Sequence, residues 1–340
     1  MLKRIISCVL ATFTLGTMMA TPALAADELR VLVHSSFSLP KPLLAQFEAQ
    51  AGTKLSIIKA GDAGEMLNKL ILTRAQPIAD VVFGIDNTLD SKAQAANVLD
   101  VLPPSLTNLN GKLGPQQVAI DYSFVNLNYD KAAVAKTGIP LPKTLDDLTL
   151  PAYRNWLVVQ NPATSSPGYA FLLATIAGMG EENAFIWWAK MRVNGLKVAK
   201  GWSEAYYTEF TRGGGTHPLV VSYASSPAAE VFYSKEKITE SPTASLFLKG
   251  GVLRQEEGVA LVKGGGQREV AQKFIDFMRS GPVQEALQTS MWMFPVDNKT
   301  PRAEVMRHAP EPAAFDSLPT QAIAGKGSQW VSRWTQVVLK

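Results

Sequence analysis

LRVLV at residues 29–33 opens a series of short apolar runs, which continues with KLSIIK at 54–59 and ADVVF at 79–83. The stretches that follow them have the apolar spacing of amphipathic helices, at residues 42–51, 65–75 and 88–96. Strands of this length separated by helices are typical of a parallel sheet covered by helices. The first part of the chain therefore predicts an α/β unit.

The middle of the chain repeats the alternation and predicts a second α/β unit. Strands are predicted at 156–159, 196–198 and 219–221, and helices at 169–177, 185–192, 203–210 and near Ala228. An extended segment at 259–262 and helices at 269–278 and 283–288 follow. Together they predict two lobes joined by more than one crossing, near Asp121 and near Ser245. We expect lobe 1 to comprise residues 26–121 and about 246–305, lobe 2 residues 122–245, and a C-terminal helical segment, 306–340, to pack on the lobes.

The first 25 residues have the features of a signal peptide. Lys3 and Arg4 precede an apolar run over residues 5–20, and the Ala-Leu-Ala that ends at Ala25 fits a cleavage site after that residue. The run is shorter than the roughly 20 residues that a membrane-spanning helix needs. The sequence therefore predicts export to the periplasm. The only cysteine, Cys8, lies in this segment, so the exported chain has neither a thiol nucleophile nor a disulfide.

The net charge and the length of the exported chain indicate which partners and which assembly to expect. Removing the segment lowers the formal net charge from +4 to +2, because Lys3 and Arg4 leave with it. The remaining basic residues form no run, which disfavours nucleic acid as a partner. About 315 residues remain, enough for two lobes, and we expect a monomer.

The sequence lacks several common catalytic and cofactor-binding motifs. It has no HExxH, no GxSxG and no dinucleotide fingerprint, and the glycines at 213–215 are not followed by the Lys-Ser/Thr of a phosphate loop. The three histidines are scattered and do not have the spacing of a metal site. We predict no catalytic residue, no metal and no cofactor.

Polar and aromatic residues follow the predicted strands, where ligands of open parallel α/β sheets bind. The candidate ligand-binding residues at these ends are His34, Asp62, Asp86, Ser165, Ser166, Trp202 and Tyr223, to which we add Asp121 at an expected crossing and Trp292 near the C-terminus. Each has a structural alternative. Asp62, Asp86 and Ser166 also suit helix N-caps, and the aromatic residues also suit a core. Six strand ends of this kind predict one polar cleft lined by aromatic side chains.

Several of these stretches resemble the thiamine-binding family of bacterial periplasmic solute-binding proteins. The matching stretches are GDAG at 61–64, ADVVFGIDN at 79–87, NPATSSPG at 161–168, KGWSEAY at 200–206, VSYASSP at 221–227 and WMFPV at 292–296. The resemblance implies a type II binding-protein fold, in which a ligand cleft lies between two lobes, each a mainly parallel sheet flanked by helices. It also implies thiamine or a thiamine phosphate as the ligand and the membrane permease of an ABC importer as the partner.

The resemblance places the family's binding residues at Asp62, Ser165, Trp202, Tyr223 and Trp292, with His34 where relatives carry Tyr or His. Thiamine contains a thiazolium ring whose positive charge is permanent, and an aromatic face or a carboxylate suits such a cation. The resemblance implies Trp292 and His34 at the ring, Asp62 at the charge or the aminopyrimidine, and Ser165, Trp202 and Tyr223 at the hydroxyethyl or phosphate end. The chain departs from the family at Ser35, Ser123 and Ala229, where relatives carry Asp, Gly and a second Tyr.

Three alternatives remain open at this point. A related binding protein would take ferric iron, for which several tyrosines and carboxylates are needed. Another would take a polyamine, for which Asp62, Asp86 and Asp121 are available. A secreted hydrolase of thiamine would need a nucleophile such as Ser222 or Ser225 facing the cleft.

Overall fold

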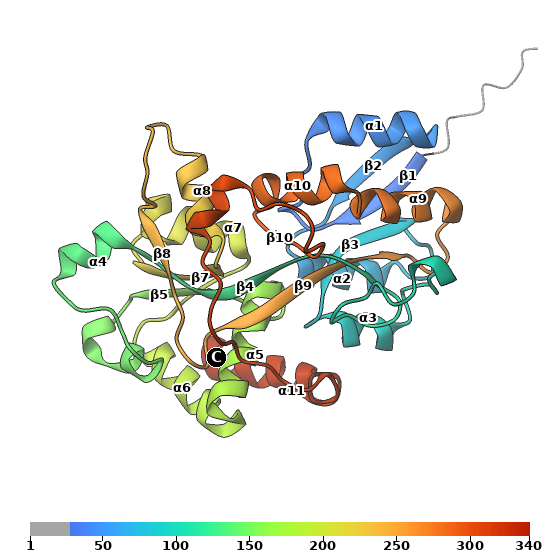
Figure 1. Ribbon diagram of the computed structural model, residues 1–340. Helices are drawn as coiled ribbons and strands as arrows, with labels where there is room; N and C mark the ends of the chain where they lie inside the picture. The colour runs from blue at the N-terminus through green and yellow to red at the C-terminus, as the bar shows by residue number, and fades with distance from the viewer. Residues whose placement is uncertain (1–27) are drawn as a thin grey trace, which may run out of the picture.

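The computed structural model describes residues 28–340, and the predicted signal peptide lies outside this range. The described residues form a mixed sheet with the strand order β2-β1-β3-β9-β4-β7-β5-β6, and β8 and β10 both pair with β4. Helices cover the sheet on its two faces (Figure 1). Among the described residues, no helix is both long and apolar enough to cross a bilayer.

The first unit is built on three parallel strands, as the sequence predicts. β1 (Glu28–Val33) pairs with both β2 (Lys54–Lys59) and β3 (Val81–Asp86). The helices between and after them are α1 (Lys41–Ala51), α2 (Ala63–Leu72) and α3 (Asp90–Ala96). α1 ends at Gly52, whose φ of 66° suits the left-handed helix cap. α2 buries Met66, Leu67 and Leu70 on the face that packs on the sheet.

The second unit repeats this arrangement. β5 (Leu157–Gln160) pairs in parallel with β6 (Lys197–Ala199) and β7 (Leu219–Tyr223). Its helices are α4 (Lys131–Thr137), α5 (Ser166–Met179), α6 (Glu181–Val193) and α8 (Ser226–Phe232). The helix predicted at 203–210 is instead the short α7 (Trp202–Glu204) followed by a π-helical turn over Ala205–Glu209. Trp187 and Trp188 on α6 are fully buried and belong to the core.

Two antiparallel strands, β4 (Val118–Asp130) and β9 (Leu253–Leu261), lie between the units (Figure 1). The first half of β4 pairs with β9, and its second half pairs with β7 and with β8 (Thr243–Leu246). Asp121, near which one crossing is predicted, lies in β4 opposite Glu257 of β9. Ser245, near which the other crossing is predicted, lies in β8 opposite Asn128 of β4, and the chain continues from β8 into β9. The strand beside β4 at the junction is β9.

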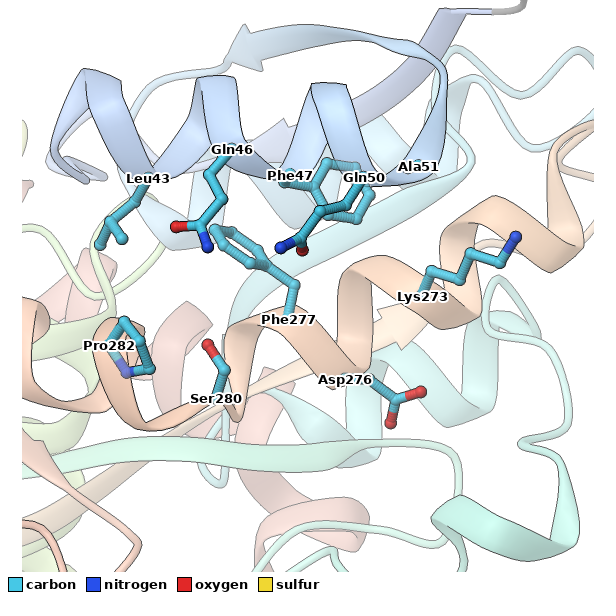
Figure 2. Close-up of a pocket in the computed structure, with 10 residues that line it drawn as sticks. All are labelled: Leu43, Gln46, Phe47, Gln50, Ala51, Lys273, Asp276, Phe277, Ser280 and Pro282. Carbon is cyan, nitrogen blue, oxygen red and sulfur yellow. The ribbon is translucent and has the colours of Figure 1, made fainter.

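The last part of the chain returns to both units. α9 (Arg268–Met278) packs against α1, and the rings of Phe47 and Phe277, 5.2 Å apart, lie between these helices (Figure 2). α10 (Gly281–Ser290) and β10 (Phe294–Pro295) follow. The C-terminal segment contains the 3-10 helix Glu304–His308 and α11 (Thr320–Leu339), which packs against α6 (Figure 1). Trp334 of α11 contacts Trp188 of α6 with ring centres 5.6 Å apart.

Candidate ligand-binding site

A cavity of about 870 Å³ lies at the junction of the two units. Six residues predicted from strand ends or from the resemblance line it: His34, Asp62, Ser166, Trp202, Tyr223 and Trp292. His34 and Asp62 follow β1 and β2 of the first unit, and Ser166 and Trp202 follow β5 and β6 of the second. Tyr223 is the last residue of β7, and Trp292 precedes β10. The cavity has a volume typical of sites that enclose a small organic ligand.

Glu257 is the most deeply buried acid of the cavity wall, with 4% of its surface exposed. It lies in the middle of β9, and its Oε1 is 3.6 Å from Nε2 of His34. Burial disfavours the charged imidazolium, but Glu257 and Asp62 outweigh this effect and the pKa of His34 is raised above its ordinary value. The carboxylate of Glu257 in the cavity wall therefore stabilises a positive charge beside it.

Asp62 lies at the N-cap of α2, and protein groups already surround its carboxylate. Oδ1 accepts a hydrogen bond from the backbone N–H of Ala63 at 2.8 Å. Oδ2 accepts one from Oγ of Ser165 at 2.7 Å and another from the backbone N–H of Trp202 at 3.0 Å. Ser165 and Trp202 belong to the second unit, so Asp62 links the two units as well as lining the cavity.

Two groups of aromatic rings contribute to the cavity. Trp202 stacks on Tyr206 with ring centres 5.1 Å apart, and Tyr207 meets Trp202 edge-on at 5.2 Å. Nε1 of Trp202 donates a hydrogen bond to Oγ of Ser222 at 2.8 Å, which fixes the indole. In the second group Trp292 meets Tyr233 at 5.5 Å. Such rings offer faces to a cation or to a planar heterocycle.

Trp292 has a backbone φ of 61°, in the left-handed region that residues with a Cβ rarely adopt. This conformation costs about 1–2 kcal/mol for a residue other than glycine. Strained residues of this kind cluster at ligand sites. The strain therefore agrees with a binding role for the indole of Trp292.

Tyr223 is held by a buried chain of hydrogen bonds. Its hydroxyl donates to Oε1 of Gln255 at 2.8 Å, and Nε2 of Gln255 donates to Oδ2 of Asp86 at 2.6 Å. Asp86 also accepts three bonds at Oδ1, from the N–H and hydroxyl of Thr88 and from the N–H of Leu89. Burial raises the pKa of Asp86 to about 6 and that of Tyr223 well above its usual range. Tyr223 is therefore a neutral hydroxyl at the cavity.

Asp86, Asp121 and Ser165 do not line the cavity, although the sequence predicts them at the ligand. Asp86 supports Gln255, and Ser165 donates to Asp62. Asp121 is completely buried in β4, opposite Glu257 of β9. Burial and the neighbouring Glu257 raise the pKa of Asp121 well above its ordinary value. Asp86 at the end of β3 and Ser165 before α5 are thus engaged by protein groups, and Asp121 lies within β4.

The structure adds lining residues that the sequence did not single out, among them Glu257, Tyr206, Tyr207, Arg212, Glu230 and Tyr233. Arg212 and Glu230 form an ion pair at 3.2 Å, and the hydroxyl of Tyr206 donates to Glu230 at 2.9 Å. Ala229, where relatives carry a second Tyr, also lines the cavity, and Tyr233 lies one helical turn further on. Among the lining residues, the acids Asp62, Glu230, Glu236 and Glu257 outnumber the bases Arg212 and Lys235. The balance favours a positively charged ligand.

The fold and the cavity define a two-lobed binding protein that encloses a small ligand where its lobes meet. The model of the family described as bacterial extracellular solute-binding protein matches residues 76–324, and the chain belongs to this family. Residues 28–340 contain no group of three or more His, Cys, Asp or Glu that could hold a metal ion.

Individual relatives agree with this assignment. The thiamine-binding periplasmic protein of Salmonella typhimurium is 32% identical over 327 residues, covering 94% of this chain and 96% of its own. The protein of the same name from Brucella abortus is 30% identical and covers 96% and 97% of the two chains. A solved structure named periplasmic thiamin binding protein superposes with a TM-score of 0.79 at 29% identity, covering 96% of this chain and 99% of that one.

More distant structures share the fold alone. The ferric binding protein from Campylobacter jejuni superposes with a TM-score of 0.72 at 20% identity, covering 91% of this chain and 99% of that chain. The prediction of a type II periplasmic binding-protein fold is confirmed, and so is the resemblance to thiamine-binding proteins. The matched relatives are themselves named as periplasmic proteins.

Proposed function

We propose that the chain is a periplasmic receptor that captures thiamine, or one of its phosphate esters, and delivers it to an ATP-driven membrane importer. The observation that carries the proposal is a cavity that combines aromatic faces with the buried carboxylate of Glu257. A thiazolium cannot lose its charge, so its binding site must supply compensating negative charge or an aromatic face. The relatives that share nearly the whole chain are named for thiamine.

The contacts suggest a division of roles within the cavity. Glu257 faces the cavity from β9, and we assign it the charge complement of the thiazolium. Asp62 already accepts three hydrogen bonds, which leaves it better suited to holding the lobes together. Trp292 and His34 keep the ring-binding role, and Trp202 and Tyr223 keep the hydroxyethyl or phosphate end. Ser166, which lines the cavity, takes the place of Ser165 at that end. This assignment changes the roles expected for Asp62 and Ser165 and adds Glu257 and Ser166 to the residues at the ligand.

The alternatives have less support from the cavity. Asp86 and Asp121, two of the three acids that suggest a polyamine, lie outside its lining. Ser222 accepts a hydrogen bond from Trp202 and lies 2.8 Å from Oγ of Ser226, and Ser225 lies 3.4 Å from Oγ of Ser123. These hydroxyls are paired with indole and hydroxyl partners instead of a general base. A receptor without catalytic residues fits the site better than a hydrolase.

Titration calorimetry of residues 26–340 tests the proposal with thiamine, its mono- and diphosphate, spermidine and ferric citrate as ligands. We expect heat of binding with at least one thiamine form, and none of comparable affinity with spermidine or ferric citrate. Absence of heat with every thiamine form would contradict the ligand assignment. Analysis of the same samples for breakdown products of thiamine distinguishes a receptor from a hydrolase, because only a hydrolase would form products.

A further inference from the structure

Four contacts beside the cavity join the start of α2 to two loops of the second unit, and of the residues that make them only Asp62 and Trp202 also line the cavity. The backbone N–H of Glu65 donates to the carbonyl of Thr164 at 3.1 Å. Oδ2 of Asp62 accepts from Ser165 and from Trp202. Nζ of Lys200 lies 2.8 Å from Oε1 of Glu65. We call this set, residues 62–65 with 164–165 and 200–202, the clasp.

Gly64 lies at the centre of the clasp and leaves no room for a side chain. A Cβ atom there would lie 2.7 Å from both the carbonyl carbon and the oxygen of Thr164, a distance that real Cβ contacts do not reach. The obstructing atoms are backbone, so a side-chain rotation cannot relieve the clash. The close approach of the two units at this point therefore depends on glycine.

The local backbone does not itself require glycine at this position. Gly64 lies in the first turn of α2, and it is absent from the residues of positive φ. An alanine in a helix is more favourable than glycine by up to about 1 kcal/mol. The separated first unit would therefore accept alanine without strain. The penalty arises only when the second unit is in place.

We propose that Gly64 is a positioning residue for ligand capture: it permits the clasp, and the clasp stabilises the closed arrangement of the lobes around the ligand. Gly64 does not line the cavity, and neither do Glu65, Thr164, Ser165 or Lys200. The clasp thus sets affinity through the population of the closed state, since a ligand binds more weakly when its competent state is rarer. The inference rests on the proposed function for the identity of the ligand.

The test is Gly64→Ala, with Gly325→Ala in α11 as the matched control because nothing lies within 4 Å of a Cβ at Gly325. We expect Gly64→Ala to weaken thiamine binding at least tenfold and the control to leave it unchanged. Thermal unfolding of the ligand-free Gly64→Ala chain should occur at a temperature equal to or above that of wild type. Equal affinity of Gly64→Ala and wild type would overturn the proposal.

A second measurement reads closure directly. The only cysteine, Cys8, precedes the expected cleavage site, so fluorophores can be placed on cysteines introduced at Gln50 of α1 and Lys136 of α4, exposed positions on the two units. Saturating thiamine should raise energy transfer in wild type more than in Gly64→Ala. If thiamine does not bind wild type, the proposed function fails. In that case the clasp is tested by the energy transfer measured without ligand. Lower energy transfer in Gly64→Ala than in wild type would support the clasp, and equal energy transfer in the two proteins would overturn it.

A charge swap supplies independent evidence for the clasp. Glu65→Lys and Lys200→Glu each place like charges together, and each should weaken thiamine binding by about two- to fivefold, since a solvent-exposed ion pair contributes little. The double variant should recover most of the wild-type affinity. Additive losses in the double variant would contradict a clasp that includes this pair.

Discussion

Nε2 of His34 lies 3.6 Å from Oε1 of Glu257 in the cavity wall, and both side chains are almost completely buried. A proton on His34 therefore neutralises the carboxylate that we assign to the ligand. Burial and the positive charge of Lys59 lower the pKa of His34, whereas the negative charges of Glu257 and Asp62 raise it. The raising effects are larger, so the pKa lies above its usual value. A bound cation and this proton compete for the same negative charge.

This competition predicts a pH dependence of affinity. Thiamine should bind more tightly as the pH rises above about 6.5, the ordinary pKa of histidine, because deprotonation of His34 frees Glu257 for the cation. Calorimetry in buffers of different ionisation enthalpy should show protons released on binding. His34→Gln should flatten the pH profile and abolish the release. A wild-type profile that is flat over this range would contradict the competition.

The strained backbone at Trp292 allows ring and backbone effects to be separated. Trp292→Ala removes the indole but keeps a Cβ at a φ of 61°, whereas Trp292→Gly removes both. Both variants should bind thiamine about 1–2 kcal/mol more weakly if the indole faces the cation. Urea unfolding should show the glycine variant to be about 1 kcal/mol more stable than the alanine variant. Unchanged affinity in both would make Trp292 a packing residue.

Asp86 should make the free energy of unfolding depend on pH between about 4 and 6. The unfolded chain releases this proton near pH 3.8 and the folded chain near pH 6, because burial raises the pKa of Asp86. The folded state therefore binds more protons in this window, and its stability falls as the pH rises. Between these pH values the free energy of unfolding should fall by about 3 kcal/mol less in Asp86→Asn than in wild type. Urea unfolding at pH 4 and pH 7 measures the difference, and equal pH slopes in the two proteins would contradict it.

Trp334 tests how firmly the C-terminal helix is docked. Its side chain is completely buried against Trp188, so Trp334→Ala should destabilise the chain by about 3–5 kcal/mol. The neighbouring Arg333 makes an exposed ion pair with Glu182, and Arg333→Ala should cost less than about 1 kcal/mol. Chemical denaturation compares the two variants. A small effect of Trp334→Ala would show that α11 contributes little to folding.

The sequence predicts the parallel strands well and the crossing strands poorly. β1 and β2 are apolar and their helices have regular spacing, so periodicity locates them. β4 carries Asp121, Ser123, Asn126 and Asn128, all buried, and this polar content hides a strand of 13 residues. Burial of these groups depends on the neighbouring strands β7 and β9, which no local pattern reveals.

The residues of the candidate site likewise divide into those that the sequence predicts and those that it does not. Strand ends predict His34, Asp62, Trp202 and Tyr223 at the cavity because parallel strands bring their carboxyl ends together. Glu257 escapes this reasoning, since it lies inside β9, an antiparallel strand at the junction. Asp86 follows the rule in sequence but is held beneath the wall by Thr88 and Gln255.

The central claim is that the cavity binds thiamine through its permanent positive charge. Competition calorimetry of wild type with thiamine and with an isostere whose thiazolium is replaced by a neutral thiophene ring tests it most directly. We expect thiamine to bind at least tenfold more tightly, and Glu257→Gln to reduce that preference while Glu269→Gln, at an exposed position of α9 outside the cavity lining, leaves it intact. Equal affinity of wild type for the charged and neutral compounds would contradict the claim.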